Sequence, residues 1–73
     1  MANAEHVAIL RKGVEHWKRW REENPDTLPD LFDTDLRGMN LRRANLGDAN
    51  LRRANLSNAL LREANLNGSA TPI

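Results

Sequence analysis

Two hydrophobic patterns divide the chain into a short N-terminal part and a longer C-terminal part. In residues 1–24, apolar side chains recur at the spacing of an amphipathic helix, and charged side chains occupy the opposite face. The apolar face carries the residues that we expect to contact the rest of the protein, which are Val7, Leu10, Val14 and Trp17. We therefore predict one N-terminal α-helix that caps the segment after it.

The ends and the middle of this helix carry recognisable signals. Asn3 is a suitable N-cap because its side chain can accept a hydrogen bond from the first turn. The residue before a proline avoids the α conformation, so the helix should end just ahead of Pro25. Gly13 lies within the apolar stripe, where glycine is costly, and we expect it to let the backbone approach a neighbour closely.

A different pattern begins at residue 29, where a leucine occupies every fifth position. Alanine stands two places before each of the last five leucines, and Asn or Asp stands one place before seven of the eight. A period of five fits neither a helix, on which the leucines would wander round the axis, nor a flat strand, on which they would alternate between faces. It fits a chain that turns a corner every five residues, so that stacked turns bury a column of leucines. The predicted column is Leu31, Leu36, Leu41, Leu46, Leu51, Leu56, Leu61 and Leu66.

Charged residues two places after the leucines indicate how many sides one turn has. Three sides would stack residues 15 apart and put Asp33 over Asp48, two like charges about 4.8 Å apart. Four sides would stack residues 20 apart and give the opposite-charge pairs Asp33 with Arg53 and Arg43 with Glu63. Four sides would also stack Arg42 over Arg62, which is unfavourable, but the balance of the charge pattern favours four sides.

Several runs of the repeat resemble a known family. Residues 44–48 (Ala-Asn-Leu-Gly-Asp) and 54–58 (Ala-Asn-Leu-Ser-Asn) resemble the pentapeptide-repeat motif A-(N/D)-L-x-x. The resemblance covers residues 29–68 and departs from the motif at Leu60, which replaces Asn or Asp. It implies an all-β solenoid, a right-handed quadrilateral β-helix of about two coils with one N-terminal α-helix capping it. The segment from His6 to Leu31 is similar to the helical lead-in of bacterial pentapeptide-repeat signalling proteins.

The expected organisation has four parts. Residues 1–24 form the capping helix, and residues 25–28 form a turn and linker in which Leu28 is tucked in. Residues 29–68 form eight repeats, and residues 69–73 form a flexible tail.

Composition narrows the classes of function. The chain has no cysteine, and its 11 Lys and Arg nearly balance its 10 Asp and Glu, for a net charge of +1. No disulfide or thiolate metal site is available, which fits a reducing, cytoplasmic location. The apolar run from Val7 to Leu10 is too short for a membrane span or a signal peptide, and we expect no membrane association. A core built from 73 residues is small, and such chains usually need a disulfide, a metal or a partner.

No arrangement of residues indicates catalysis. Ser57 and Ser69 have no nearby histidine, and no glycine-rich phosphate loop precedes a helix. His6 and His16 have no cysteine or facing carboxylate pair, so we expect surface or boundary histidines and no metal site. We predict no enzyme activity and no cofactor.

The repeats carry two further sets of polar residues. The Asn residues before the leucines are expected to stabilise turns through hydrogen bonds to the backbone. The arginines could bind a phosphate backbone, but Asp33 and Glu63 lie among them and Phe32 is the one aromatic residue of the repeats. We interpret these arginines as solvated faces: Arg37, Arg42, Arg43, Arg52, Arg53 and Arg62.

The leading hypothesis for function is a non-catalytic module for protein–protein interaction and self-assembly. An uncapped last coil exposes leucines and unpaired backbone groups, so a second copy of the chain would cover it and form a dimer. The candidate residues for this homo-oligomer are Leu51, Leu56, Leu60, Leu61 and Leu66. The same hypothesis leaves open a second form, in which the module binds a different protein.

Two alternatives belong to other classes of function. Some pentapeptide-repeat proteins mimic DNA and inhibit type II topoisomerases such as gyrase, and the resemblance extends that hypothesis to this chain. The second alternative is weak binding of nucleic acid, or of an acidic partner, through the arginine faces.

Overall fold

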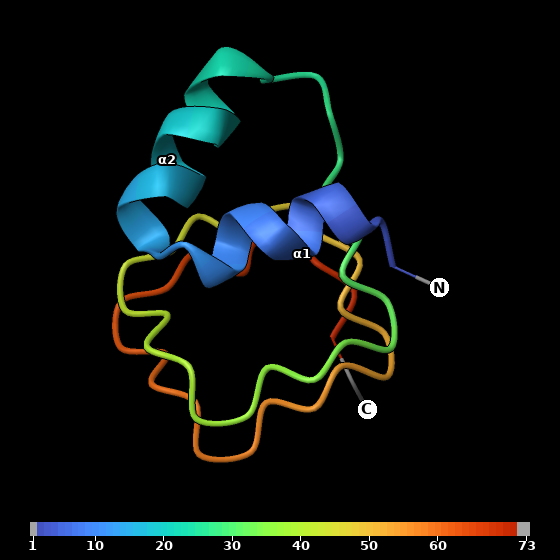
Figure 1. Ribbon diagram of the computed structural model, residues 1–73, viewed down its shortest axis with the longest axis vertical. Helices are drawn as coiled ribbons and strands as arrows, with labels where there is room; N and C mark the ends of the chain where they lie inside the picture. Colours follow the sequence, from blue (N-terminus) through green and yellow to red (C-terminus); the bar gives the residue numbers. More distant parts are fainter. Residues whose placement is uncertain (1, 72–73) are drawn as a thin grey trace.

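The computed structural model describes residues 2–71, which form two helices followed by two stacked coils. The helices are α1 (Ala4–Arg11) and α2 (Val14–Glu23). Figure 1 shows the coils as two nearly superposed loops, with α1 running across them. The repeats thus build a short solenoid, and the helices lie against it.

The N-terminal segment is two helices, so the prediction of one continuous capping helix over residues 1–24 is wrong. Gly13 has a φ of 116°, which lies outside the helical region and which glycine adopts without the penalty of a Cβ atom. Lys12 ends α1 as its C-cap, and Gly13 begins α2 as its N-cap. A Cβ atom on Gly13 would meet nothing within 4 Å. The glycine therefore serves the turn of the backbone and not the close approach that we expected.

The outer ends of the helical pair follow the sequence signals. Asn3 Oδ1 accepts hydrogen bonds from the backbone N–H groups of Glu5 at 2.9 Å and His6 at 3.3 Å, as an N-cap does. Asn24 is the C-cap of α2, directly before the proline. In the linker, Leu28 is 67% exposed, so the expectation that it is tucked in is wrong.

The two coils pair each residue with the residue 20 positions later. Parallel bridges join Asp30 to Asn50, Asp35 to Asn55, Asn40 to Leu60, Asn45 to Asn65 and Asn50 to Ala70. Four five-residue sides therefore make one coil, as the charge pattern predicted. Within residues 2–71 these are single bridges and not extended strands, which corrects the expected all-β character. The reason is that a turn takes up most of each five-residue side.

A turn of one kind closes every side of the coil. The second residue after each leucine has a positive φ between 56° and 72° in all eight repeats. In seven of the eight repeats, the third residue after the leucine donates its N–H to the leucine carbonyl, as Ala54 does to Leu51 at 3.0 Å. If the leucine is the first residue of a four-residue turn, the residue with positive φ is the third, and a type II turn requires a positive φ at that position. Each five-residue repeat thus forms the same turn, and the turns follow one another around the coil.

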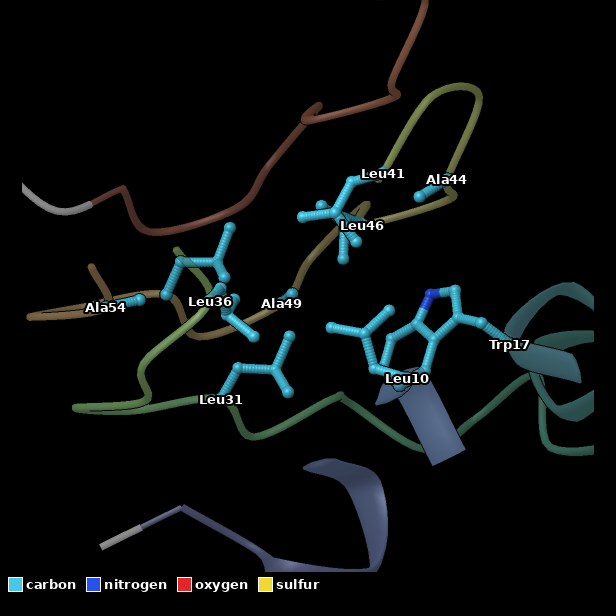
Figure 2. Packing of buried hydrophobic residues seen from close by; sticks show 10 residues of the cluster. Leu10, Trp17, Leu31, Leu36, Leu41, Ala44, Leu46, Ala49 and Ala54 are labelled. Carbon is cyan, nitrogen blue, oxygen red and sulfur yellow. The ribbon is translucent and has the colours of Figure 1, made fainter. Parts of the chain in front are cut away.

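Leucines and alanines point inward and form the core. Leu31, Leu36, Leu41, Leu46 and Leu51 are fully buried, together with Leu10 of α1 and Trp17 of α2. Figure 2 shows the Trp17 ring and Leu10 directed toward this leucine cluster. The last three leucines of the predicted column, Leu56, Leu61 and Leu66, are only partly buried.

The regular pairing continues into the segment that we expected to be a tail. Ala70 donates its N–H to the Ala49 carbonyl at 2.9 Å and accepts from the N–H of Leu51 at 2.8 Å. Ser69 donates its N–H to the Leu66 carbonyl at 3.1 Å. The coil therefore extends at least to residue 70. Residues 72 and 73 of the expected tail 69–73 lie outside the described residues.

Candidate functional site

The edge of the first coil is closed by polar contacts from both helices. Trp17 Nε1 of α2 donates to the Asn45 carbonyl at 2.7 Å. Arg11 Nη2 of α1 donates to the Asp35 carbonyl at 2.8 Å. These side chains supply hydrogen bonds to backbone carbonyls that have no coil above them.

A second group of contacts holds the start of the coil at Asp30. The Asn3 N–H donates to the Asp30 carbonyl at 3.2 Å. The Asp30 N–H donates to Nδ1 of His6 at 3.0 Å, and His6 is 9% exposed. The imidazole is thus a buried hydrogen-bond acceptor at the junction of cap and coil. His16, the other histidine that we considered, is exposed.

Apolar side chains of the helices seal the same end of the coil. Leu10 and Trp17 are fully buried, and Val7 and Val14 pack against the core as partly buried residues. Trp20 also belongs to this cap, since its ring lies 5.1 Å from that of Trp17 and tilts against it. The four predicted cap contacts therefore lie together on the first coil.

Sequence reasoning missed the polar half of this cap. The amphipathic pattern puts Arg11 with the charged side chains on the solvent face, and it gives no hydrogen-bond partner for His6. The predicted coil could have indicated both contacts. The first coil of a solenoid must offer backbone groups that point away from the second coil, and the helical residues nearest to them are candidates to pair with them.

The edge of the second coil is built differently. Leu36, Leu41 and Leu46 each donate their N–H to a carbonyl of the second coil at 2.8 Å. Within residues 2–71, the equivalent N–H groups of the second coil have no backbone partner, and these belong to Leu56, Leu61 and Leu66. The carbonyls of Thr34, Met39 and Ala44 accept bonds, and their second-coil equivalents, Ala54, Ala59 and Ala64, have no such partner in the same range. This edge presents both apolar surface and unpaired backbone.

Two of the five predicted self-association residues lie elsewhere. Leu51 is fully buried, and its N–H is paired with Ala70. Leu60 is 44% exposed, and it occupies the position that carries an Asn or Asp in the other repeats, on the outer wall. The open edge of the second coil is therefore made by Leu56, Leu61 and Leu66.

The outer walls carry the charges, stacked as the sequence predicted. Arg43 Nε donates to Glu63 Oε1 at 3.1 Å, and Arg53 Nε lies 3.7 Å from Asp33 Oδ1. The Arg53 guanidinium also lies 5.8 Å from the ring centre of Phe32. These pairs are exposed, so each contributes little to stability. The pairs are a consequence of the register of the two coils and add little to its stability.

One pair on the wall has a clear effect on titration. Arg37 donates from Nε and Nη2 to the Asp35 carboxylate at 2.9 and 2.8 Å. The side-chain hydrogen bonds from Arg37, followed by its backbone N–H, lower the pKa of Asp35 from its usual 3.8 to about 2. The carboxylate in turn raises the pKa of Arg37.

The ladder of Asn and Asp residues caps the turns. In seven of the eight repeats, the side-chain Oδ1 accepts the N–H of the residue two places later, at 2.9 to 3.2 Å. Such Asx turns satisfy a backbone donor locally and favour the bend. The ladder therefore stabilises turns, and Leu60 marks the repeat that lacks this bond.

No group of three His, Asp or Glu side chains gathers in residues 2–71 as metal ligands would. Neither α1 nor α2 combines the length and the apolar character that a membrane-spanning helix needs.

Four five-residue sides to a coil, with an inward leucine and an Asx-capped turn on nearly every side, define a solenoid of five-residue repeats. The family profile described as Pentapeptide repeats matches eight copies over residues 30–68, which is more than half of the chain. The chain belongs to the pentapeptide-repeat family. Comparisons with curated proteins and with solved structures give no significant match.

Proposed function

We propose that this protein is a non-catalytic self-association module that pairs through the open edge of its second coil. The observation that carries the proposal is the contrast between the two ends. The first coil is sealed by Leu10 and Trp17, whereas Leu56, Leu61 and Leu66 are only partly buried and their N–H groups lack backbone partners in residues 2–71.

Both features of the open edge favour pairing with another backbone. Unpaired N–H and C=O groups in a row are a template for strand addition. Burying the remaining leucine surface contributes roughly 25 cal/mol for each Å² removed from water. A core of this size also benefits from a partner, since small domains are marginal alone.

A second copy of the chain fits the open edge through a two-fold axis. A two-fold interface uses the same surface on both subunits, so one dimer covers both open edges. Facing sides then run antiparallel, and N–H to C=O bonds can form in symmetric pairs, one on each side of two directly opposite residues. The Leu61 N–H of one copy and the Ala59 carbonyl of the other are suitable partners, and the reverse bond follows by symmetry.

For the coil itself, we infer the right-handed quadrilateral form that the family resemblance implies. The pairing of residues 20 apart supports four sides to a coil.

The alternative function as a DNA-mimicking topoisomerase inhibitor gains no support, because such mimicry needs a negative surface and the repeats carry six arginines.

Sedimentation equilibrium over a range of protein concentrations tests the proposal. We expect a dimer that dissociates on dilution. Leu61→Lys should shift the equilibrium to monomer, because it puts a charge into the interface. The matched control is Leu28→Lys, which changes a leucine that is 67% exposed in the linker and should leave the dimer intact. A wild-type protein that stays monomeric at high concentration would refute the proposal.

A further inference from the structure

The repeat that lacks an Asx turn has an unused backbone donor. In the other seven repeats, the Asn or Asp before the leucine accepts the N–H two places later, as Asn50 does from Arg52 at 3.1 Å. Leu60 has no acceptor to offer. Among the described residues, the Arg62 N–H therefore has no hydrogen-bond partner.

The surroundings of that donor are strongly basic. Because Asn40 pairs with Leu60, Arg42 of the first coil stacks over Arg62 of the second. Neither guanidinium forms an ion pair within residues 2–71, while the neighbouring Arg43 is already paired with Glu63. These side chains line a surface depression of about 670 Å³ together with Asn40 and Val14.

Among the described residues, Arg42 and Arg62 stack without a carboxylate paired to either, because Glu63, which lines the same depression, is held by Arg43. This arrangement is unfavourable for the wall alone. Like charges directly opposite one another on adjacent strands are destabilising. A bound anion would relieve that repulsion and gain charge-assisted hydrogen bonds from both guanidinium groups. The free N–H of Arg62 adds a third donor of fixed direction on the same wall.

We propose that this wall binds the carboxylate of an acidic peptide segment. One carboxylate oxygen takes the Arg62 N–H, in the place of the missing Asn oxygen, and the guanidinium groups of Arg42 and Arg62 hold its charge. Leu60, 44% exposed, offers an apolar contact to the peptide residue next to the acid.

The observations favour a peptide over nucleic acid. Binding of single-stranded nucleic acid relies on aromatic stacking platforms along a basic groove. The repeats have one aromatic residue, Phe32, and it lies against Arg53 on a different wall. A carboxylate beside an aliphatic residue matches the donors and the exposed leucine more closely. The proposal uses the outer wall and does not depend on self-association through the open edge.

Titration of ¹⁵N-labelled protein with the acetylated and amidated tripeptide Glu-Leu-Glu tests this site. We expect the largest saturable amide shift at Arg62 and little shift at Arg52, whose N–H is held by Asn50. Arg62→Gln should weaken binding about tenfold, since it removes a charge-assisted bond. The matched control Arg52→Gln removes the same charge from another wall and should weaken binding less than about twofold.

The substitution Leu60→Asn separates a specific site from a generally basic surface. It supplies the missing turn oxygen, so it should weaken peptide binding about tenfold while the melting temperature stays the same or rises. Peptide binding that is unchanged in Leu60→Asn, or equally weakened by Arg52→Gln and Arg62→Gln, would overturn the proposal. Tighter binding of a short single-stranded oligonucleotide than of the peptide would overturn the choice of partner.

Discussion

The two coils are made of the same repeat but differ in how completely they are buried. Leu36, Leu41 and Leu46 of the first coil are fully buried, whereas Leu56, Leu61 and Leu66 of the second are not. The turns and the inward direction of the leucines are alike in both. The difference lies in what covers each coil: the helices cover the first, whereas among the described residues the second is covered only where Ala70 pairs beside Leu51. In a repeat protein, burial is therefore set by the neighbours of a repeat and not by its sequence alone.

The largest effect should come from removing the seal of the first coil. Trp17→Ala should cost about 3–5 kcal/mol of unfolding free energy, because it empties a fully buried aromatic site. Urea denaturation followed by circular dichroism measures it. Trp17→Phe keeps a ring but leaves the Asn45 carbonyl without its donor, and should cost about 1–3 kcal/mol. A loss below about 1 kcal/mol for Trp17→Ala would mean that the helices do not close the core.

The next effect compares two leucines stacked on the same side of the solenoid. Leu46→Ala should cost about 2–5 kcal/mol, since Leu46 is fully buried. Leu66→Ala should cost clearly less in dilute protein, because part of its side chain is already in water. The same denaturation experiment on both variants gives the comparison. Equal losses would show that the second coil is covered as well as the first.

A smaller effect should be the same in both coils. Asn40→Ala and Asn50→Ala each remove one Asx oxygen, which accepts an N–H at 3.2 and 3.1 Å respectively. Each should lower stability by about 0.5–1.5 kcal/mol, the net contribution of a typical hydrogen bond. Because the turn is local, we expect the two losses to agree. A much larger loss in one coil would show that the turns are not equivalent.

The smallest effect should come from the exposed pair of Asp35 and Arg37. The folded pKa of Asp35 is depressed, so its contribution to stability is present above its usual pKa of 3.8 and is lost as the pH falls toward about 2. Asp35→Asn keeps the turn oxygen and removes the charge. Urea midpoints should therefore fall slightly more for the wild type than for Asp35→Asn across this window, and added salt should shrink the difference. Parallel curves would contradict the effect.

Much of the solenoid follows from the sequence. The five-residue period predicted the inward leucines, and the stacked charges at Asp33 and Arg53 predicted four sides to a coil. Both predictions agree with the structure because each turn forms within one repeat, so every repeat carries the same information about the turn.

The predictions that fail concern the helical segment and its contacts with residues far away in the sequence. Gly13 breaks the N-terminal segment because its positive φ turns the second helix onto the coil. That turn brings Trp17 to Asn45 and the preceding helix brings His6 to Asp30. Periodicity within one segment carries no information about these contacts. The exposure of Leu28 also escaped prediction, because a linker residue has no repeat to place it.

Hydrogen exchange of the leucine amides at two protein concentrations tests whether the second coil ends in an open edge that a second copy covers. The N–H groups of Leu36 and Leu46 are bonded to the second coil and should exchange slowly at both concentrations. Those of Leu61 and Leu66 should exchange quickly in dilute protein and slow down in concentrated protein, where a second copy covers the open edge. Slow exchange of Leu61 and Leu66 in dilute protein, or fast exchange at both concentrations, would contradict the account.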